Sequence, residues 1–200
     1  MISEILPLTK NKLEIFKYIY EKKGSHLLDI SKNLKIHPYS VQKTLKSIKK
    51  LFVEKKAGRT IILSLDKNLP GYFELLYLIE DYKLTIDSKD LKILIRNLKE
   101  FFSKDKNVLS CVLFGSFARN VSGEDIDLLF LVKKRSDYVI EKCSQLSTLF
   151  GKEVSPLVML EKEFKSALQS KEPTIISILE PSQRLLVVGK EYFLRFSYDG

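Results

Sequence analysis

The chain of 200 residues is poor in cysteine and histidine. Its two cysteines, Cys111 and Cys143, lie in an apolar segment and in a predicted helix, and no C-x-x-C pair occurs. Both are therefore predicted to be buried thiols of a protein in the reducing cytoplasm. The two histidines, His26 and His37, have no acidic or cysteine partner at ligand spacing, which argues against a zinc site built on them.

Long apolar segments are also missing. No run of eighteen apolar residues occurs, so no membrane-spanning helix and no membrane partner are expected. The first residues lack a basic region followed by an apolar core, which is the pattern of a secretory signal. These absences predict a cytoplasmic protein. The apolar fraction of 44% is ordinary and allows a packed core, and the length suits one large domain or two small ones.

Negative charge is scarce in one part of the chain only. Residues 1–68 contain 15 Lys and Arg but 6 Asp and Glu, whereas residues 69–200 contain 19 of each kind. The whole excess of nine positive charges therefore lies in the first third. This asymmetry favours a polyanionic partner for residues 1–68, most simply nucleic acid, and the alternative is a lysine-rich soluble surface.

The pattern of this basic part predicts three short helices followed by a β-hairpin. Apolar residues recur at helical spacing over residues 9–23, 25–34 and 38–48, and Pro38 suits the first position of the third helix. Two segments of strand character flank Gly58, which predicts the turn of the hairpin. This arrangement resembles the winged helix-turn-helix DNA-binding domains, and we interpret residues 1–68 as such a domain.

The resemblance implies that the third helix enters the major groove of duplex DNA and that the hairpin reaches the backbone or the minor groove. Side chains that read bases or bind phosphates are then expected on the outer side of this helix and on the hairpin. They are Tyr39, Ser40, Gln42, Lys43, Lys46 and Lys50 on the helix, and Lys55, Lys56 and Arg59 on the hairpin. The alternative is a basic helical domain that binds protein.

A boundary follows the hairpin at residues 68–71, which read Asn-Leu-Pro-Gly. Residues 72–82 are apolar nearly all round, so a helix there must be buried on most sides. We interpret residues 69–88 as a connecting segment whose helix lies between two domains or pairs with its copy in a homodimer. Residues 89–200 then form the second domain.

The second domain contains two neighbouring acidic residues inside an apolar segment. Residues 108–132 read as an apolar strand, a Gly-Ser turn, a short helix, a loop and a second apolar strand that contains Asp125 and Asp127. Strand side chains alternate, so both carboxylates point to one face. They repel each other and are poorly solvated beside apolar residues, which predicts a hard divalent cation, Mg²⁺ or Mn²⁺, between them. Gly115 and Ser116 permit a tight turn before a helix start, which suits a phosphate.

The order of these residues resembles a known family. Gly115-Ser116-x-Ala118-Arg119 followed by Asp125-x-Asp127 is similar to the minimal nucleotidyltransferases of the DNA-polymerase-beta-like superfamily, over about residues 90–195. The resemblance implies a nucleoside triphosphate held by Gly115, Ser116 and Arg119, whose guanidinium is a fixed fork of donors. It also implies metal ions held by the two aspartates. The loop of eight residues between Ser116 and Asp125 is shorter than the ten that the family more often has.

A third carboxylate of the family lies on a later strand. By the usual spacing it would fall on Ser155 here, and a serine is not a base at neutral pH. Glu153 lies two residues earlier and points the same way, which makes it the candidate third catalytic acid; the alternative is a surface acid at a strand start. Pro156 cannot donate to a strand ladder, so this strand is predicted to lie at an edge or to carry a bulge.

These patterns together predict an α+β chain. An N-terminal winged helix-turn-helix precedes an α/β nucleotidyltransferase domain with a mixed sheet of about four strands flanked by helices. The first hypothesis is an enzyme that transfers a nucleoside monophosphate from a triphosphate such as ATP to a hydroxyl of a partner protein or a small molecule. The second is a DNA-binding transcriptional regulator whose transferase domain binds nucleotide with little or no turnover, which the serine at position 155 favours.

Overall fold

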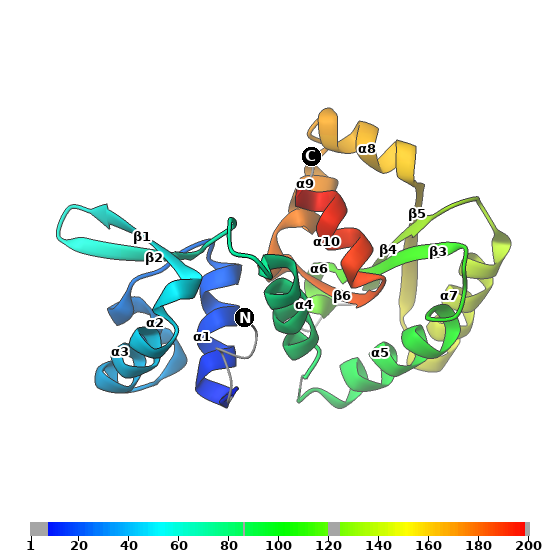
Figure 1. Cartoon of the computed structure of the whole chain (residues 1–200). Helices are drawn as coiled ribbons and strands as arrows, with labels where there is room; N and C mark the ends of the chain where they lie inside the picture. The colour runs from blue at the N-terminus through cyan, green and yellow to red at the C-terminus, as the bar shows by residue number, and fades with distance from the viewer. Residues whose placement is uncertain (1–7, 86, 120–124, 199–200) are drawn as a thin grey trace. The chain divides into compact units, whose positions relative to one another are not determined.

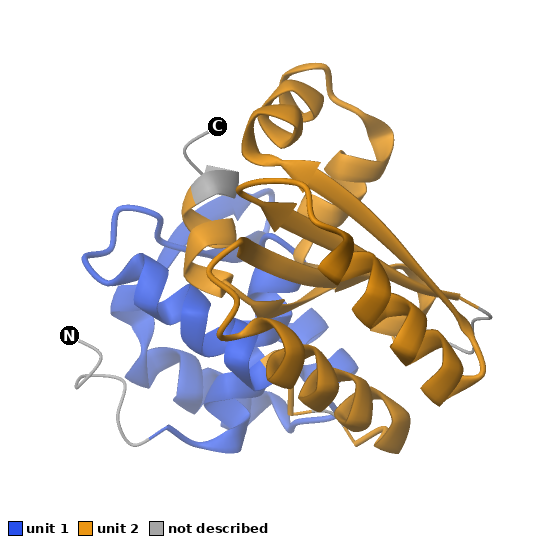
Figure 2. Cartoon of the chain, turned by 90° about the vertical axis from the view of Figure 1, so that its right-hand side faces the viewer, with its two compact units in different colours: residues 1–82 blue, residues 83–200 orange. Residues whose placement is uncertain are grey.

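The chain divides into two compact units, residues 1–82 and 83–200, which Figure 2 colours separately. The computed structural model describes residues 8–85, 87–119 and 125–198, so most of the loop before Asp125 lies outside the described residues. Within these ranges no helix has the length and apolar character needed to cross a bilayer. The two units are described separately below.

The first unit has the three helices and the hairpin expected from the sequence. Its elements are α1 (Lys10–Glu21), α2 (Leu27–Leu34), α3 (Pro38–Ser47), the single turn η2 (Lys49–Leu51), β1 (Phe52–Ala57), β2 (Thr60–Leu65) and α4 (Tyr72–Lys83), of which the last residue, Lys83, belongs to the second unit. Pro38 occupies the start of α3, as predicted. Gly58 has a φ of 60° in the turn between β1 and β2, a conformation that glycine adopts without strain.

A short backbone bridge joins the start of α2 to the hairpin. The N–H of Ser25 donates to the carbonyl of Leu63 over 2.9 Å, and the N–H of Leu63 donates back to Ser25 over 2.8 Å. The Ser25 hydroxyl also donates to the Asp29 carboxylate over 2.5 Å, and the Tyr18 hydroxyl donates to the same oxygen over 2.9 Å. One carboxylate therefore ties α1, the start of α2 and, through Ser25, the hairpin together.

The helix α4 packs with the first unit through polar contacts that its apolar pattern does not indicate. The Tyr20 hydroxyl of α1 donates to the fully buried Glu80 over 2.8 Å, and the Tyr82 hydroxyl donates to Glu14 over 2.6 Å. Burial of most of the helix was expected, but Phe73 and Tyr77 are exposed. The buried side of α4 therefore includes the carboxylate of Glu80, whereas two of its aromatic residues face solvent.

The second unit has the mixed four-stranded sheet that was expected. Its elements are α5 (Lys89–Phe102), β3 (Val108–Phe114), α6 (Gly115–Ala118), β4 (Asp125–Val132), α7 (Asp137–Phe150), β5 (Glu153–Leu160), α8 (Glu161–Gln169), α9 (Pro173–Leu179), η3 (Pro181–Gln183), β6 (Arg184–Val188) and α10 (Lys190–Tyr198). The strand order is β5-β4-β3-β6, with β4 and β5 parallel and the other pairs antiparallel. β5 lies at an edge, which confirms the prediction from Pro156.

Helices cover both faces of this sheet (Figure 1). Apolar side chains of α5 and α7 form one core with Ile126, Leu128 and Phe130 of β4. The helices α8 and α10 lie against the opposite face, where Phe164 and Phe193 are in ring contact. Because side chains alternate along β4, Asp125 and Asp127 point to the face of α8 and α10.

The two cysteines are buried in the core between the sheet and the helices α5 and α7, and both are free thiols, as predicted. Burial raises the pKa of the Cys143 thiol to about 12 and raises that of Cys111 well above its usual range. Neither thiol is ionised at neutral pH, so both serve as small apolar residues of the core.

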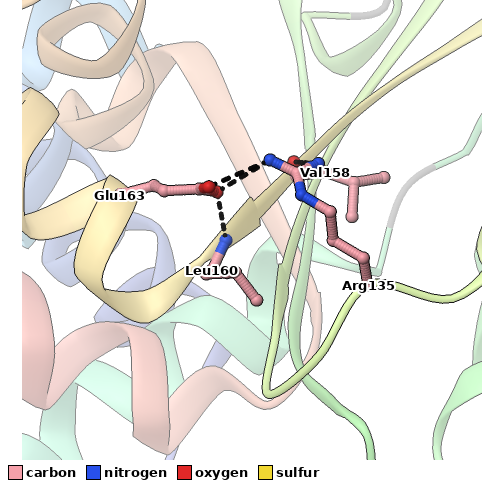
Figure 3. A network of polar contacts seen from close by, with 4 residues as sticks. All are labelled: Arg135, Val158, Leu160 and Glu163. Carbon is pink, nitrogen blue, oxygen red and sulfur yellow. Dashed lines mark hydrogen bonds and ion pairs between the residues drawn. The ribbon is translucent and has the colours of Figure 1, made fainter.

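An exposed ion pair fixes the end of β5 that lies away from the aspartates (Figure 3). Arg135 Nη2 contacts both carboxylate oxygens of Glu163 at 3.0 and 3.1 Å, and Arg135 Nη1 donates to the Val158 carbonyl over 3.4 Å. Glu163 also accepts the N–H of Leu160 over 2.8 Å, which caps the start of α8. The network connects the loop after β4 with the junction of β5 and α8.

Candidate active site

The Gly-Ser turn directly follows β3 and comes very close to β4. Gly115 has a φ of 74°, in the left-handed region that favours glycine. A Cβ atom at this position would lie 2.2 Å from Asp127 Oδ2, a distance that real side chains do not tolerate. Strand pairing explains the approach, because Phe114 is the register partner of Asp127. The tight turn predicted from Gly115 is therefore present, and it lies against one of the two aspartates.

The two aspartates form a negatively charged pair at the start of β4. Asp125 is exposed, and Asp127 is half-buried next to Gly115. Burial raises the pKa of the Asp127 carboxyl, and the negative charge of Asp125 raises it further. In the part of the chain that the structure describes, no group of three or more His, Cys, Asp or Glu side chains is arranged to hold a metal ion. The chain thus offers two hard oxygen donors of unfavourable mutual charge, which suits a divalent cation with further ligands from outside the protein.

The parallel strand β5 places its polar residues beside these aspartates. Ser155 is the register partner of Asp127, and Glu153 is the register partner of Asp125. All four side chains belong to the same face because directly paired residues of a sheet share a face. The position at which the third acid was expected is therefore next to Asp127, and it carries the serine. Glu153 is exposed and lies on β5 two residues before Ser155, beside Asp125.

Arg119 makes a contact that sequence reasoning did not foresee. Its Nη1 atom donates to Oε1 of Gln183 over 2.9 Å, and Gln183 is the last residue of η3. The two residues are 64 positions apart, and no local pattern links them. The pairing of β3 with β6 explains the contact. Phe114 pairs with Arg184, so Gln183, the residue before Arg184, lies beside the Gly115 turn.

A buried arginine completes this end of the sheet and was also missed. Arg184 is 3% exposed, on the same face as Phe114 and Asp127. Its guanidinium donates to the carbonyls of Leu179 and Ile178 at the end of α9, and it lies 5.1 Å from the ring centre of Phe193. Arg184 therefore anchors α9 and α10 to the start of β6, which gives it a structural role.

The first unit exposes the side chains proposed for nucleic acid. Val41 and Leu45 of α3 are buried, so the opposite side of this helix faces solvent, and Tyr39 is 68% exposed there. Most of the predicted contact residues are exposed and Ser40 is half-buried; the exposed ones are Tyr39, Gln42, Lys43, Lys46, Lys50, Lys55, Lys56 and Arg59. Lys50, which was predicted on the third helix, lies instead in the single turn η2, because α3 ends at Ser47. The structure thus brings the cations of α3 and of the hairpin to the surface, as a contact with a polyanion requires.

A comparison with protein families gives one match in the second unit. Residues 96–178 match the family model described as polymerase beta, nucleotidyltransferase. The comparisons with curated proteins and with solved structures gave no significant match. The matched segment runs from α5 to α9 and includes the Gly-Ser turn, both aspartates and β5. The match supports a nucleotidyltransferase domain in this part of the chain and suggests nucleotidyl transfer.

Proposed function

We propose that this protein is a nucleotidyltransferase that transfers a nucleoside monophosphate from a triphosphate to a hydroxyl acceptor. The observation that carries the proposal is the close approach of the Gly115 turn to Asp127, within the segment that matches the family model. A tight turn and a carboxylate pair meet at one end of the sheet, so phosphate groups at the backbone N–H groups of the turn and a cation at the carboxylates can bind side by side.

The chain's own residues take separate roles in this proposal. The Gly115-Ser116 turn and the Ser116 hydroxyl bind the β- and γ-phosphates, and Arg119 donates to phosphate oxygens through its guanidinium. Asp125 and Asp127 hold Mg²⁺ or Mn²⁺ when the triphosphate binds. The metal would supply charge neutralisation for the leaving pyrophosphate and alignment of the attacking oxygen. The raised pKa of Asp127 supports this role because burial and a neighbouring like charge make a bound cation favourable there.

The test of the carboxylate pair is metal-dependent triphosphate binding. Asp125→Asn with Asp127→Asn keeps the size of both side chains and removes their charge. Calorimetric titration of Mg·ATP and Mg·GTP into the full chain is expected to show binding that requires the metal and disappears in the double variant. Unchanged affinity in the double variant would mean that the carboxylates are not metal ligands.

Turnover depends on the base that accepts the proton of the acceptor hydroxyl. General-base catalysis typically contributes ~10²–10⁴-fold in rate. With a serine beside Asp127, we expect slow or absent transfer unless Glu153 serves as the base. Ser155→Asp should raise transfer of labelled nucleotide, and Glu153→Gln should abolish it if Glu153 is the base. If the wild type transfers nucleotide rapidly and Glu153→Gln does not change the rate, another group accepts the proton.

A second function, the binding of duplex DNA by residues 1–68, is favoured by a separate observation. The nine excess positive charges lie in this part of the chain, and the cations of α3 and of the hairpin are exposed. Three helices followed by a hairpin also agree with a winged helix-turn-helix arrangement. Together with weak turnover, this would make the protein a DNA-binding regulator that senses nucleotide.

A further inference from the structure

We infer that Gln183 is a positioning residue of the triphosphate site, where it holds Arg119 ready for the phosphates. The inference rests on the proposed function and adds a residue that lies outside both sequence motifs. Its direct basis is the hydrogen bond from Arg119 Nη1 to Gln183 Oε1, with a length of 2.9 Å. Arg119 closely follows the Gly-Ser turn in the sequence, whereas Gln183 comes from a distant part of the chain.

The register of two strands places Gln183 beside the turn. β3 and β6 are antiparallel, and Phe114 at the end of β3 faces Arg184 at the start of β6. One residue beyond this pair stand Gly115 on one side and Gln183 on the other. Sheet geometry therefore brings Gln183 to the turn proposed to bind phosphate, independently of the contact with Arg119.

The backbone around Gln183 is anchored on both sides. The ammonium group of Lys83, which is 4% exposed, donates to the carbonyl of Pro181 over 2.7 Å and to that of Arg184 over 2.9 Å. The N–H of Gln183 donates to the Glu180 carbonyl over 2.9 Å. A buried cation thus fixes the residues that flank Gln183, so its side-chain amide is an acceptor held on a rigid support.

The chemistry of an amide suits this role. Gln183 accepts a hydrogen bond from the guanidinium without neutralising its positive charge, which remains available to a phosphate. A carboxylate in the same place would pair with Arg119 and repel a triphosphate. An arginine held before binding loses less side-chain freedom when the ligand arrives than a free one does. The contact should therefore raise affinity for the phosphates.

Titration of two ligands into the full chain tests the inference. Gln183→Met removes the acceptor at similar length and is expected to weaken Mg·ATP binding about three- to tenfold, the change that one ordinary hydrogen bond produces. Magnesium tripolyphosphate, which has no base or sugar, should lose the same factor because the effect lies at the phosphates. Gln183→Glu should weaken both ligands further through its charge.

A double-mutant cycle separates positioning from general structure. In the Arg119→Ala background, Gln183→Met should cause no further loss, and Gln169→Met, at an exposed site on α8, should leave wild-type affinity unchanged. Equal losses in both backgrounds, or no loss, would overturn the inference while the proposed function stands. A wild-type chain that binds neither ligand would overturn both. Gln183→Ala replaces Gln183→Met in the cycle if the methionine variant does not fold.

Discussion

At the scale of single residues, the backbone turn at Gly115 lies directly against the carboxylate of Asp127. The turn needs a residue without a side chain for two separate reasons, the positive φ and the distance of 2.2 Å from a Cβ to Asp127 Oδ2. The carboxylate in turn lies in a place that raises its pKa. The first feature restricts position 115 to glycine, and the second makes the charged form of Asp127 unfavourable. Features of this kind are typical of ligand-binding sites.

Gly115→Ala is expected to lower both Tm and triphosphate affinity more than Gly151→Ala does. Each alanine meets a left-handed backbone, which costs about 1–2 kcal/mol. A Cβ at Gly151, with a φ of 60°, has no atom within 4 Å, so that variant measures the backbone effect alone. Only Gly115→Ala must displace Asp127. Thermal melts and Mg·ATP titrations make the comparison, and equal losses of affinity in the two variants would contradict the close approach.

Asp127→Asn is expected to stabilise the fold while it removes metal-dependent nucleotide binding. The raised pKa means that the folded chain holds this proton more tightly than the unfolded chain does. Its contribution to stability is therefore greatest in acid and is lost as the pH rises from the ordinary carboxyl pKa through the raised one. At neutral pH the amide should raise Tm, because it removes a charge that burial and the neighbouring Asp125 make unfavourable.

The control for this variant is Glu100→Gln, which removes one charge from an exposed site on α5. Its Tm should stay close to that of the wild type. Addition of Mg²⁺ with ATP should raise the Tm of the wild type and of Glu100→Gln but not that of Asp127→Asn. A Tm of Asp127→Asn below the wild-type value without metal would show that the carboxylate is not in an unfavourable place.

At the scale of elements, the junction of α1, α2 and the hairpin depends on one carboxylate. Asp29 accepts from the hydroxyls of Ser25 and Tyr18, and these hydrogen bonds, that from Ser25 first, hold the pKa of Asp29 below its usual range. The phenol responds in the opposite sense: burial and its contacts with Asp29 raise the pKa of Tyr18 to about 12. Both shifts favour the ionised carboxylate beside a protonated phenol at neutral pH.

This junction gives the first unit an acid-sensitive element. Because the pKa of Asp29 is lowered on folding, its contribution is present above the ordinary carboxyl pKa and is lost as the pH falls through the lowered one. Asp29→Asn is expected to reduce the free energy of unfolding by about 1–2 kcal/mol at neutral pH and by less in acid. Urea unfolding between about pH 7 and pH 3, followed by circular dichroism, measures the difference.

Glu54→Gln provides the comparison, because Glu54 pairs with Lys49 at 3.4 Å on the surface of the same unit. An exposed pair of this kind contributes about 0–1 kcal/mol. Its removal should therefore change the free energy of unfolding less than Asp29→Asn does. If both variants lost the same free energy of unfolding at every pH, the hydrogen bonds of Asp29 would stabilise the unit no more than an exposed ion pair does.

At the scale of the whole molecule, positive charge and candidate chemistry belong to different units. The excess cations lie in residues 1–68, whereas the aspartates and the family match lie in the second unit. This separation agrees with the proposal that one unit binds a polyanion and the other a nucleotide. We expect DNA affinity to reside in residues 1–68 and to fall steeply with salt, because each bound phosphate releases counterions.

The salt dependence can be tested with matched charge removals. Lys43→Ala with Lys46→Ala should make the slope of log affinity against log salt shallower by about 0.9 for each lysine that binds a phosphate. Lys162→Ala with Lys171→Ala removes the same charge from exposed sites of the second unit and should leave the slope unchanged. Fluorescence anisotropy of labelled duplex DNA at several salt concentrations provides the measurement. Equal slopes for the two double variants would refute the assignment to α3.

Most elements of both units could be predicted from the sequence because helix and strand periodicity are local properties. The stripe of α5, the start of α3 at Pro38 and the turn at Gly58 follow from spacing, proline chemistry and glycine chemistry within a few residues. The edge position of β5 followed from the missing N–H of Pro156. By contrast, the apolar pattern of α4 did not indicate the buried Glu80, since its partner Tyr20 lies 60 residues away.

The sequence by itself determined the order of elements, the common face of Asp125 and Asp127 and the location of the positive charge. Each depends on neighbouring residues or on composition. Only the tertiary structure decided that Ser155 lies beside Asp127, that Gly115 closely approaches its carboxylate and that Gln183 reaches Arg119. These pairings follow from strand order and register, which bring distant segments together because the sheet must bury its apolar faces, and no local pattern specifies them.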